Sequence, residues 1–534
     1  MFRIFLPIVL ILLYLTGYSQ NKQTNNSDKP DWEDGYPEGC TTVAVGKLAT
    51  FDGSVMTSHT DDSHRTRSNL DIVPAMTHER DAMVTLFKRE NDDTQRMPAY
   101  KNVPVGKISQ IENTFGYINT AYPCINDQQV AIGETTFGGR EELKSDKGLI
   151  DCQRLCMLML ERGKTARDAI RIAGDLLEEY GWNDYGEMLT IADPNEVWVF
   201  EVVGPGKDKV GAVWAARRVP DDHIFVGANA SRIRQIDTKN PDYFMYSKNV
   251  FDVAKENGWW NPEDGEFEFC YAYADRNSMA ARRREWRVFD LVAPSLKLHP
   301  NSENYPFSVK PEKPVTLEKM VEIFSDYYEG TEFNFIKDLT VTDDSGRTVI
   351  SPLANPFMPY DMNKLFKING GWGWRGERTI ARWYTMYATI IQCRSWLPNE
   401  IGGLVWLAWD NVATSIYAPF YAGITRVHKT SSTDGRVTGF SRNSAWWAFN
   451  HLGTLAAQRW GDMRHDVRAV WDPWQAELFA KQKSFEDEIL SQWAIDREKA
   501  KEILTKYCIE IQMDIVQQAW DLSEELWTKY DEMF

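Results

Sequence analysis

Cys40 stands at the head of a strand-like stretch, and the chain before it has the composition of a removable leader. If that leader is cleaved, Cys40 carries a thiol and a free α-amine on a single residue. A thiol has an ordinary pKa of about 8.5 and an α-amine one of about 7.7–8.0, so both exchange protons near neutral pH. The amine then accepts the thiol proton, directly or through water, and the thiolate attacks an amide carbonyl. The position of Cys40 therefore predicts hydrolysis of an amide bond through a thioester intermediate.

The leader divides into two parts. Residues 1–19 combine a short basic start, an apolar run of about a dozen residues and small residues at the end, which is the pattern of a signal peptide. The run is too short for a permanent membrane span, which needs about 20 residues. Residues 20–39 are polar, and we expect a disordered pro-segment that ends at Gly39. We therefore expect an exported protein, periplasmic or secreted. A lipid on Cys40 is disfavoured, because a lipid-bearing cysteine directly follows the apolar segment.

The composition is ordinary for a folded globular chain, with 43% apolar and 26% charged residues. The net charge is −17 and no basic stripe is present, which argues against nucleic acid as a partner. After the leader, no apolar stretch reaches the length of a membrane span. The length predicts one large domain or two fused ones. A homo-oligomer is compatible with the sequence and is not specified by it.

The seven cysteines form an odd set without a regular disulfide framework. In an exported chain an odd count indicates one free thiol, and Cys40 is our candidate. Cys152 and Cys156 lie four residues apart in an apolar helical stretch without a histidine pair, so we interpret them as core residues and not as metal ligands. No zinc signature, phosphate-binding loop or dinucleotide fingerprint is present. We expect neither a metal nor a cofactor.

Several segments have a clear periodicity of apolar residues. Alternating residues predict two strands around the turn at Asp52-Gly53, and further strands at 130–137, 188–203 and 211–229. Residues 151–180 have a helical period, and residues 474–534 predict two long amphipathic helices with Trp527 in their buried stripe. Strands, helices and strands again favour a layered α+β protein with mostly antiparallel sheets.

The pattern C-T-T-x-x-V-G-K-x-A-T-x-D-G-S over residues 40–54 resembles the opening of the cysteine dipeptidase family that includes bacterial dipeptidase A and the secernins. Choloylglycine hydrolase and penicillin V acylase are more distant relatives. The resemblance implies a four-layer αββα N-terminal-nucleophile hydrolase sandwich over residues 40–430. Residues 431–534 would form a C-terminal, mostly helical extension.

The same resemblance implies the catalytic partners of Cys40. Asp62 matches the aspartate that hydrogen-bonds the amine of the nucleophile. His59 stands where distant relatives have arginine, and a protonated histidine would favour the thiolate and make activity pH-dependent near 6–7. The Asn229 side chain and the backbone N–H of Thr136 match the donors that stabilise the oxyanion. The alternatives are a solvated loop around Asp62 and a turn-capping role for Asn229.

Two further positions are candidates for substrate binding. Relatives carry an active-site arginine in the region of Arg284 and Arg287, although a surface helix is an equal alternative there. Trp372 belongs to a Gly/Trp/Arg stretch at 369–378 that would either line a substrate cleft, with an arginine gripping a peptide carboxylate, or pack as a loop over the core.

These residues predict an exported cysteine dipeptidase that acts on dipeptides or short peptides. An acylase on the same fold, which cuts an N-acyl amide such as a bile salt or a lactone signal, would use the same mechanism and differ in its pocket. A non-catalytic binding protein that holds glycan or peptide on its aromatic residues is the third interpretation, since the chain has 21 tryptophans.

Overall fold

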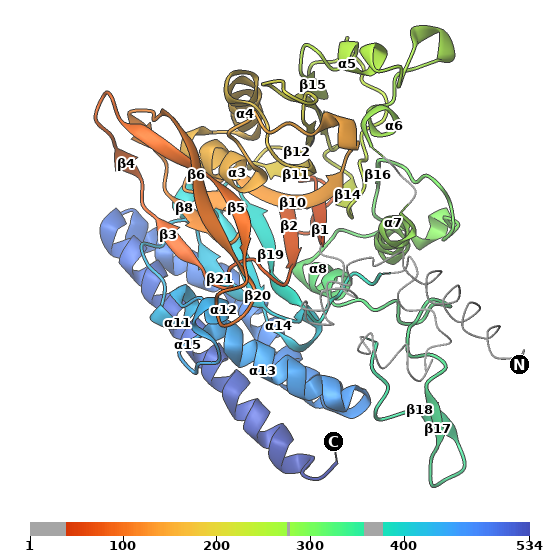
Figure 1. Ribbon diagram of the computed structural model, residues 1–534. Helices are drawn as coiled ribbons and strands as arrows, with labels where there is room; N and C mark the ends of the chain where they lie inside the picture. The colour runs from red at the N-terminus through yellow and green to blue at the C-terminus, as the bar shows by residue number, and fades with distance from the viewer. Residues whose placement is uncertain (1–38, 275–277, 357–377, 534) are drawn as a thin grey trace, which may run out of the picture.

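A computed structural model describes residues 39–274, 278–356 and 378–533 (Figure 1). The expected signal peptide and the expected pro-segment up to residue 38 lie outside the described residues. Two large antiparallel sheets occupy the centre, as an α+β class requires. None of the helices in the described part of the chain has the length and apolar character that a membrane span needs.

The sheet that carries Cys40 has seven strands. Their order is β16-β14-β1-β2-β19-β20-β21, and each neighbouring pair is antiparallel. The turn at Asp52-Gly53 joins β1 to β2 as the sequence predicts, with Gly53 at φ 85° and the Asp52 carboxylate accepting from the Ser54 N–H at 3.0 Å. The strands are β1 Gly39–Val45, β2 Val55–Asp62, β14 Ile224–Gly227, β16 Ser308–Val309, β19 Thr385–Cys393, β20 Leu404–Trp409 and β21 Ala418–Tyr421.

The second sheet has eight strands in the order β15-β13-β12-β11-β10-β9-β8-β3. Strands β10, β11 and β12 are buried along nearly their whole length, although β10 carries three consecutive polar residues, Glu134, Thr135 and Thr136. The strands are β3 Asp71–Val73, β8 Tyr117–Asn119, β9 Ile125–Asn126, β10 Ala131–Gly138, β11 Gly186–Ala192, β12 Val197–Val203, β13 Val213–Arg218 and β15 Phe244–Tyr246.

The two sheets pack face to face, with β1 and β2 against β10 and β11. Gly133 of β10 lies at this interface, and a Cβ there would come within 2.1 Å of the Ser58 carbonyl oxygen on β2. The hydroxyl of Thr190 on β11 is hydrogen-bonded to Thr42 at 2.8 Å and to Thr57 at 2.7 Å. Small and hydroxylated residues therefore let the sheets approach closely beside the nucleophile strand.

Helices cover both sheets. Helix α3 (Cys152–Arg162) contacts β9 of the eight-stranded sheet, and α4 (Ala166–Tyr180) contacts β11 and β12. Their N-termini are capped by Asp151 and Thr165, whose side chains accept from backbone N–H groups within the first turn. Helices α13 (Ala445–Gln458) and α15 (Arg497–Lys529) contact β20 and β21 of the seven-stranded sheet. The residues expected to form an extension therefore cover the sheet of Cys40.

The other elements lie at the edges of the layers. A long hairpin is formed by β5 and β6, and short pairs by β4 with β7 and β17 with β18. These strands are β4 Met76–Thr77, β5 Met83–Asp92, β6 Ala99–Ser109, β7 Asn113–Thr114, β17 Thr340–Thr342 and β18 Thr348–Ile350. The other helices are η1 Glu141–Leu143, α5 Asp252–Glu256, η2 Pro262–Asp264, α6 Phe269–Tyr273, α7 Met279–Val292, η3 Pro294–Leu296, α8 Leu317–Phe324, α10 Asn399–Gly402, η4 Val412–Thr414, α11 Lys429–Ser432, α12 Gly435–Thr438 and α14 Trp460–Trp493.

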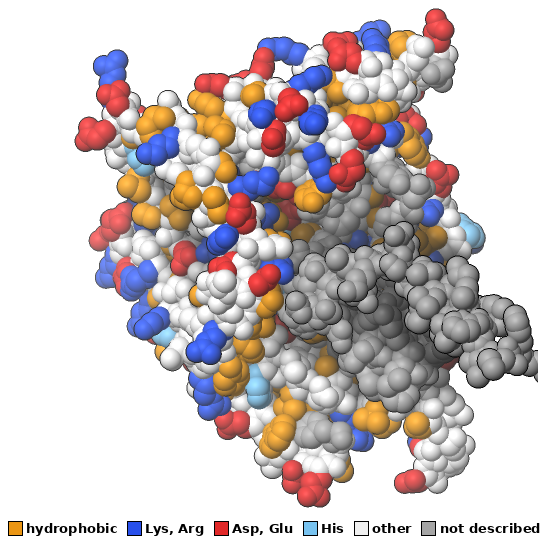
Figure 2. Space-filling model, viewed as in Figure 1, with side chains coloured by type: hydrophobic (Ala, Val, Ile, Leu, Met, Phe, Trp, Pro, Cys, Tyr) orange, Lys and Arg blue, Asp and Glu red, His pale blue; other side chains and the backbone are white. Residues whose placement is uncertain are grey.

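The predicted strands at 130–137 and 188–203 and the helices within 151–180 are confirmed. The two long C-terminal helices are also present, but Trp527 is 59% exposed, so its place in a buried stripe was wrong. Acidic and basic side chains are interspersed on the described surface seen in Figure 2, without a continuous basic stripe on that face.

Candidate active site

Cys40 is the second residue of β1 and is only 5% exposed. Its backbone N–H donates to Oδ1 of Asn229 at 3.2 Å, and its thiol donates to Oε2 of Glu134 at 3.2 Å. Its carbonyl oxygen accepts from Nη1 of Arg284 at 2.8 Å and from the Thr135 hydroxyl at 3.1 Å. The backbone and the sulfur of Cys40 are thus held on both sides by residues from other elements.

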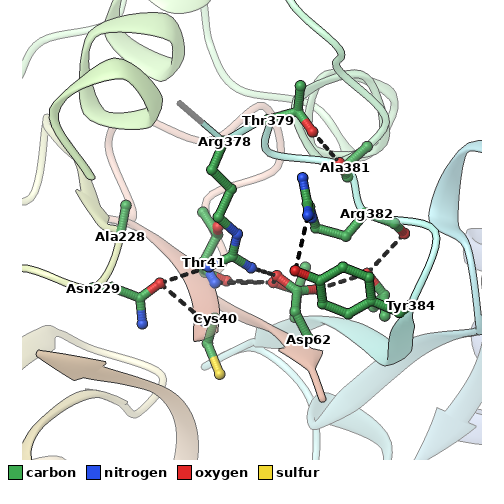
Figure 3. Close-up of polar contacts among 12 residues, drawn as sticks. Cys40, Thr41, Asp62, Ala228, Asn229, Arg378, Thr379, Ala381, Arg382 and Tyr384 are labelled. Carbon is green, nitrogen blue, oxygen red and sulfur yellow. Dashed lines mark hydrogen bonds and ion pairs between the residues drawn. The ribbon is translucent and has the colours of Figure 1, made fainter. Parts of the chain in front are cut away.

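Two arginines, Arg284 and Arg378, flank the backbone of Cys40, and Figure 3 shows Arg378 between Asn229 and Asp62. Arg284, on α7, also donates to the Thr41 hydroxyl at 2.9 Å and to Oδ1 of Asn229 at 2.9 Å. Arg378 donates to the same Asn229 oxygen at 2.9 Å and forms an ion pair with Asp62. Burial, with Arg378 next in importance, lowers the pKa of Arg284 to about 9, which leaves its guanidinium charged at neutral pH. Arg284, expected near the substrate, therefore supports the nucleophile strand.

Asp62 ends β2 and lies opposite Gly39 in the strand register. Its carboxylate binds Arg378 and accepts from the Thr385 hydroxyl at 2.6 Å. The residue is buried, and the ion pair compensates its charge. Asp62 thus lies beside the peptide bond before Cys40, and its contact with a liberated amine stays a prediction.

Asn229 has a left-handed backbone, with φ 59°, immediately after β14. This conformation points its side chain at Cys40, while its backbone N–H donates to the Thr135 hydroxyl at 3.0 Å. Its Nδ2 donates to the Thr136 carbonyl at 2.7 Å. The two predicted oxyanion residues are therefore neighbours, and the amide nitrogen expected to meet the oxyanion is engaged by Thr136 in this arrangement. Their role as oxyanion donors stays a prediction.

A pair of buried glutamates lies below the thiol. The Thr136 hydroxyl donates to Oε1 of Glu134 at 3.2 Å and to Oε1 of Glu187 at 2.8 Å. Burial, reinforced by Glu134, raises the pKa of Glu187 well above its ordinary range. Burial also raises the pKa of the Cys40 thiol, and Glu134 and Asp61 raise it further. The thiol is therefore neutral at rest and needs a proton acceptor to react.

His59 lies beside this cluster on β2. Its Nδ1 accepts from the backbone N–H of Glu134 at 3.1 Å, and its ring packs against Tyr122 and Tyr387 with centroids 5.4 and 5.6 Å away. Burial lowers the pKa of His59 below its ordinary 6.5. Burial thus favours the neutral imidazole, and the expected pH dependence of activity near 6–7 stays a prediction.

A cavity of about 970 Å³ opens above Cys40. Its wall is polar and carries both charges, with carboxylates close to the nucleophile and cations on the surrounding strands and loops. Among the lining residues are Cys40, Asp61, Asp62, Arg89, Tyr100, Tyr122, Thr136, Asp151, Asp184, Glu187 and Lys207. Trp372, expected in such a cleft, lies outside the described residues. The volume is within the range of small-molecule sites, about 300–1,000 Å³.

Two groups of metal-ligand type occur near the thiol within the described residues. They are Cys40 with His59 and Asp61, and Glu134 with Cys152 and Glu187; in each group the ligand atoms lie within 4.8 Å of one another. Cys152, interpreted as a core residue, is indeed buried, and it is adjacent to the two glutamates.

The sequence interpretation missed several of the residues that converge on Cys40. Glu134 was detectable, because strand residues two apart share a face and Thr136 was already a candidate. Arg378 ends the stretch at 369–378 that was proposed for a substrate cleft, but its pairing with Asp62, 316 residues away in the sequence, gave no local signal. The cavity residues of β5 and β6 gave no signal, because β5 carries charged residues on both faces and β6 lacks a regular apolar alternation.

The chain is a peptidase. It belongs to Peptidase family C69, which it matches over residues 39–472. The match begins one residue before Cys40 and includes every site residue named above. It also continues through α13 and into α14, beyond the expected boundary at 430.

Curated relatives are similar over most of their length. A "probable dipeptidase" from Latilactobacillus sakei is 25% identical over 515 residues, which cover 92% of each chain. A "probable dipeptidase" from Salmonella dublin is 24% identical, covering 72% of this chain and 81% of its own. "Dipeptidase A" from Lactobacillus helveticus is 23% identical, covering 80% of this chain and 83% of its own.

Proposed function

We propose that this protein is an exported cysteine dipeptidase of the N-terminal-nucleophile type, with a four-layer αββα architecture. The observation that carries the proposal is the buried Cys40 thiol at the floor of a polar cavity, hydrogen-bonded to Glu134 and aligned by Asn229. The names of the relatives support a dipeptide substrate, and the composition of residues 1–39 supports export and removal of the leader.

In the proposed mechanism the amine of a terminal Cys40 takes the thiol proton. The thiolate attacks the scissile carbonyl, the amine product leaves with a proton, and water then cleaves the thioester and regenerates the thiol. Glu134, 3.2 Å from the sulfur, stabilises the positive charge that the amine gains. Arg284 and Asn229 hold the residue so that the attack has a fixed direction.

The charges around the sulfur favour a dipeptide over an N-acyl amide. One oxygen of Asp61 lies within 4.8 Å of the sulfur, and Glu134 is closer still. In a dipeptide the α-ammonium is two bonds from the carbonyl under attack, so it reaches the same space. An ammonium is attracted by these carboxylates, whereas a neutral acyl group gains no such attraction.

The test is release of amino acids from dipeptides and from their N-acetyl derivatives, with wild type, Cys40→Ala and Cys508→Ala. We expect hydrolysis of free dipeptides, a loss of at least about 10³-fold in Cys40→Ala, and retained activity in Cys508→Ala, whose buried thiol lies on α15. Hydrolysis of the N-acetyl compounds alone would establish the acylase instead. A Cys40→Ala variant as active as wild type would exclude Cys40 as the nucleophile.

A further inference from the structure

The hairpin of β5 and β6 contributes two basic side chains to the cavity, Lys88 and Arg89. Lys88 is exposed and donates to the side-chain oxygen of Asn183 at 2.7 Å, whereas Arg89 is half-buried. Arg89 and Asn91 of β5 and Tyr100 of β6 line it, and Asn91 pairs with Tyr100 in the strand register. Residues that alternate along a strand share a face, so Arg89 and Asn91 both point inward. Lys101, the next residue after Tyr100, lies on the opposite face, is exposed and pairs with Glu90.

Arg89 is fixed by uncharged groups. Its Nη2 donates to the Tyr122 hydroxyl at 3.0 Å, and its guanidinium lies 4.9 Å from the Tyr122 ring centroid and 5.2 Å from that of Tyr100. Within the described residues, no carboxylate oxygen comes within the 4.0 Å of an ion pair with Arg89. An arginine has five N–H donors, so most of its capacity is left for a ligand in the cavity.

Two carboxylates of the cavity wall that act on Arg89, Asp151 and Asp184, accept hydrogen bonds from backbone N–H groups. Asp151 accepts from the N–H of Arg154 at 2.8 Å as the cap of α3. Asp184 accepts from the N–H groups of Cys152 at 3.1 Å and Tyr185 at 2.9 Å. Both raise the pKa of Arg89 against the effect of burial, and the result lies above its ordinary value. Arg89 is therefore a permanent cation whose neighbours do not bind it directly.

We propose that Arg89 binds the free C-terminal carboxylate of the peptide substrate, with the Tyr122 hydroxyl holding the guanidinium in place. This inference rests on the proposed peptidase function. It makes the cavity a receptor for a zwitterion, with carboxylates around the sulfur for the ammonium end and one held arginine for the carboxylate end. Arginine binds carboxylates through two parallel hydrogen bonds, which fixes both the position and the length of the peptide.

The experiment compares a dipeptide with the same dipeptide as its C-terminal amide. We expect wild type to prefer the free acid. Arg89→Gln should lower kcat/KM for the acid by about 10- to 100-fold, mainly through KM, and leave the amide nearly unchanged. Arg89→Lys should recover part of the loss, because a lysine keeps the charge without the paired geometry. Lys101→Gln, on the outer face of the same hairpin, should leave both substrates unaffected.

The possible failures are distinct. Equal losses on acid and amide in Arg89→Gln, or in Arg89→Lys when Arg89→Gln does not fold, would make Arg89 a structural residue and overturn the inference. A wild type that hydrolyses acid and amide equally well would also overturn it, while the dipeptidase function stands. A wild type inactive on both would overturn the proposed function and this inference together.

Discussion

Glu134 is the residue whose position bears most directly on the reactivity of the Cys40 thiol. It faces the sulfur from β10 of the opposing sheet, next to Glu187 on β11, whose pKa is raised by burial and by Glu134. Glu134 is therefore the acidic side chain that contacts the Cys40 sulfur directly.

Glu134→Gln replaces this carboxyl group by an amide of nearly the same shape. We expect kcat for a dipeptide to fall by about 10- to 100-fold and the pH–rate profile to shift, because the cationic amine formed in the reaction loses its counter-charge. Steady-state kinetics between pH 5 and 9 measure both effects. Glu179→Gln, exposed on α4, is the control and should behave as wild type. An unchanged rate and profile in Glu134→Gln would remove the glutamate from the mechanism.

Residue types and local spacing could predict the nucleophile and several of the polar residues around it. Cys40, Asp62, Thr136 and Asn229 do converge in the fold, although the first contacts of Asp62 are with Arg378 and Thr385. Pairings across hundreds of residues carry no local signal, which is why the contacts by which Arg378 joins Asp62 to Asn229 were not foreseen. Protonation was equally hidden, since the lowered pKa of His59 results from burial that no spacing expresses.

At the scale of elements, strands with strict alternation were predictable and helix α14 was not. The expected helical region began at 474, directly after Pro473, a residue type that normally interrupts a helix. Here α14 starts at Trp460 and continues through Pro473. The first part of the helix buries Met463, Val467 and Trp471. Tertiary packing of these side chains outweighs the local cost of the proline.

The turn after β20 makes stability depend on pH. Burial raises the pKa of Asp410 to about 7, against an ordinary value near 3.9 in an unfolded chain. Between these values the folded state keeps a proton that the unfolded state has lost, so the free energy of unfolding falls as the pH rises from about 4 to 7. Asp410→Asn removes this titration while its side-chain oxygen still accepts from Asn450.

We therefore expect the free energy of unfolding of Asp410→Asn, relative to that of wild type, to rise by something on the order of 1–3 kcal/mol from pH 4.5 to pH 8. Urea unfolding at the two pH values measures the difference. Asp338→Asn, at an exposed position, is the control and should show no such trend. A constant difference between Asp410→Asn and wild type across this range would contradict the assigned titration.

For the whole molecule, the decisive prediction concerns the first residue of the mature chain. Gly39 is buried, and a Cβ on it would come within 2.4 Å of Arg378 Nη1 and 2.5 Å of Asn229 Oδ1. The bond that must be cut to free the Cys40 amine thus lies within the site itself. We expect intact mass and terminal sequencing of active protein to give Cys40 as the first residue. Active protein that starts near Gln20 would contradict the mechanism, because Cys40 would then have no free amine.

The strand order around Cys40 also determines when, during synthesis of the chain, the candidate site can assemble. Strand β2 is completed on its far side by β19, and the Thr385 hydroxyl meets Asp62 across 323 residues of sequence. A chain growing from its N-terminus exposes the cysteine early but acquires β19 only after most of its synthesis is finished. The polar surroundings of Cys40 are therefore completed only after β19 has been synthesised and has paired with β2.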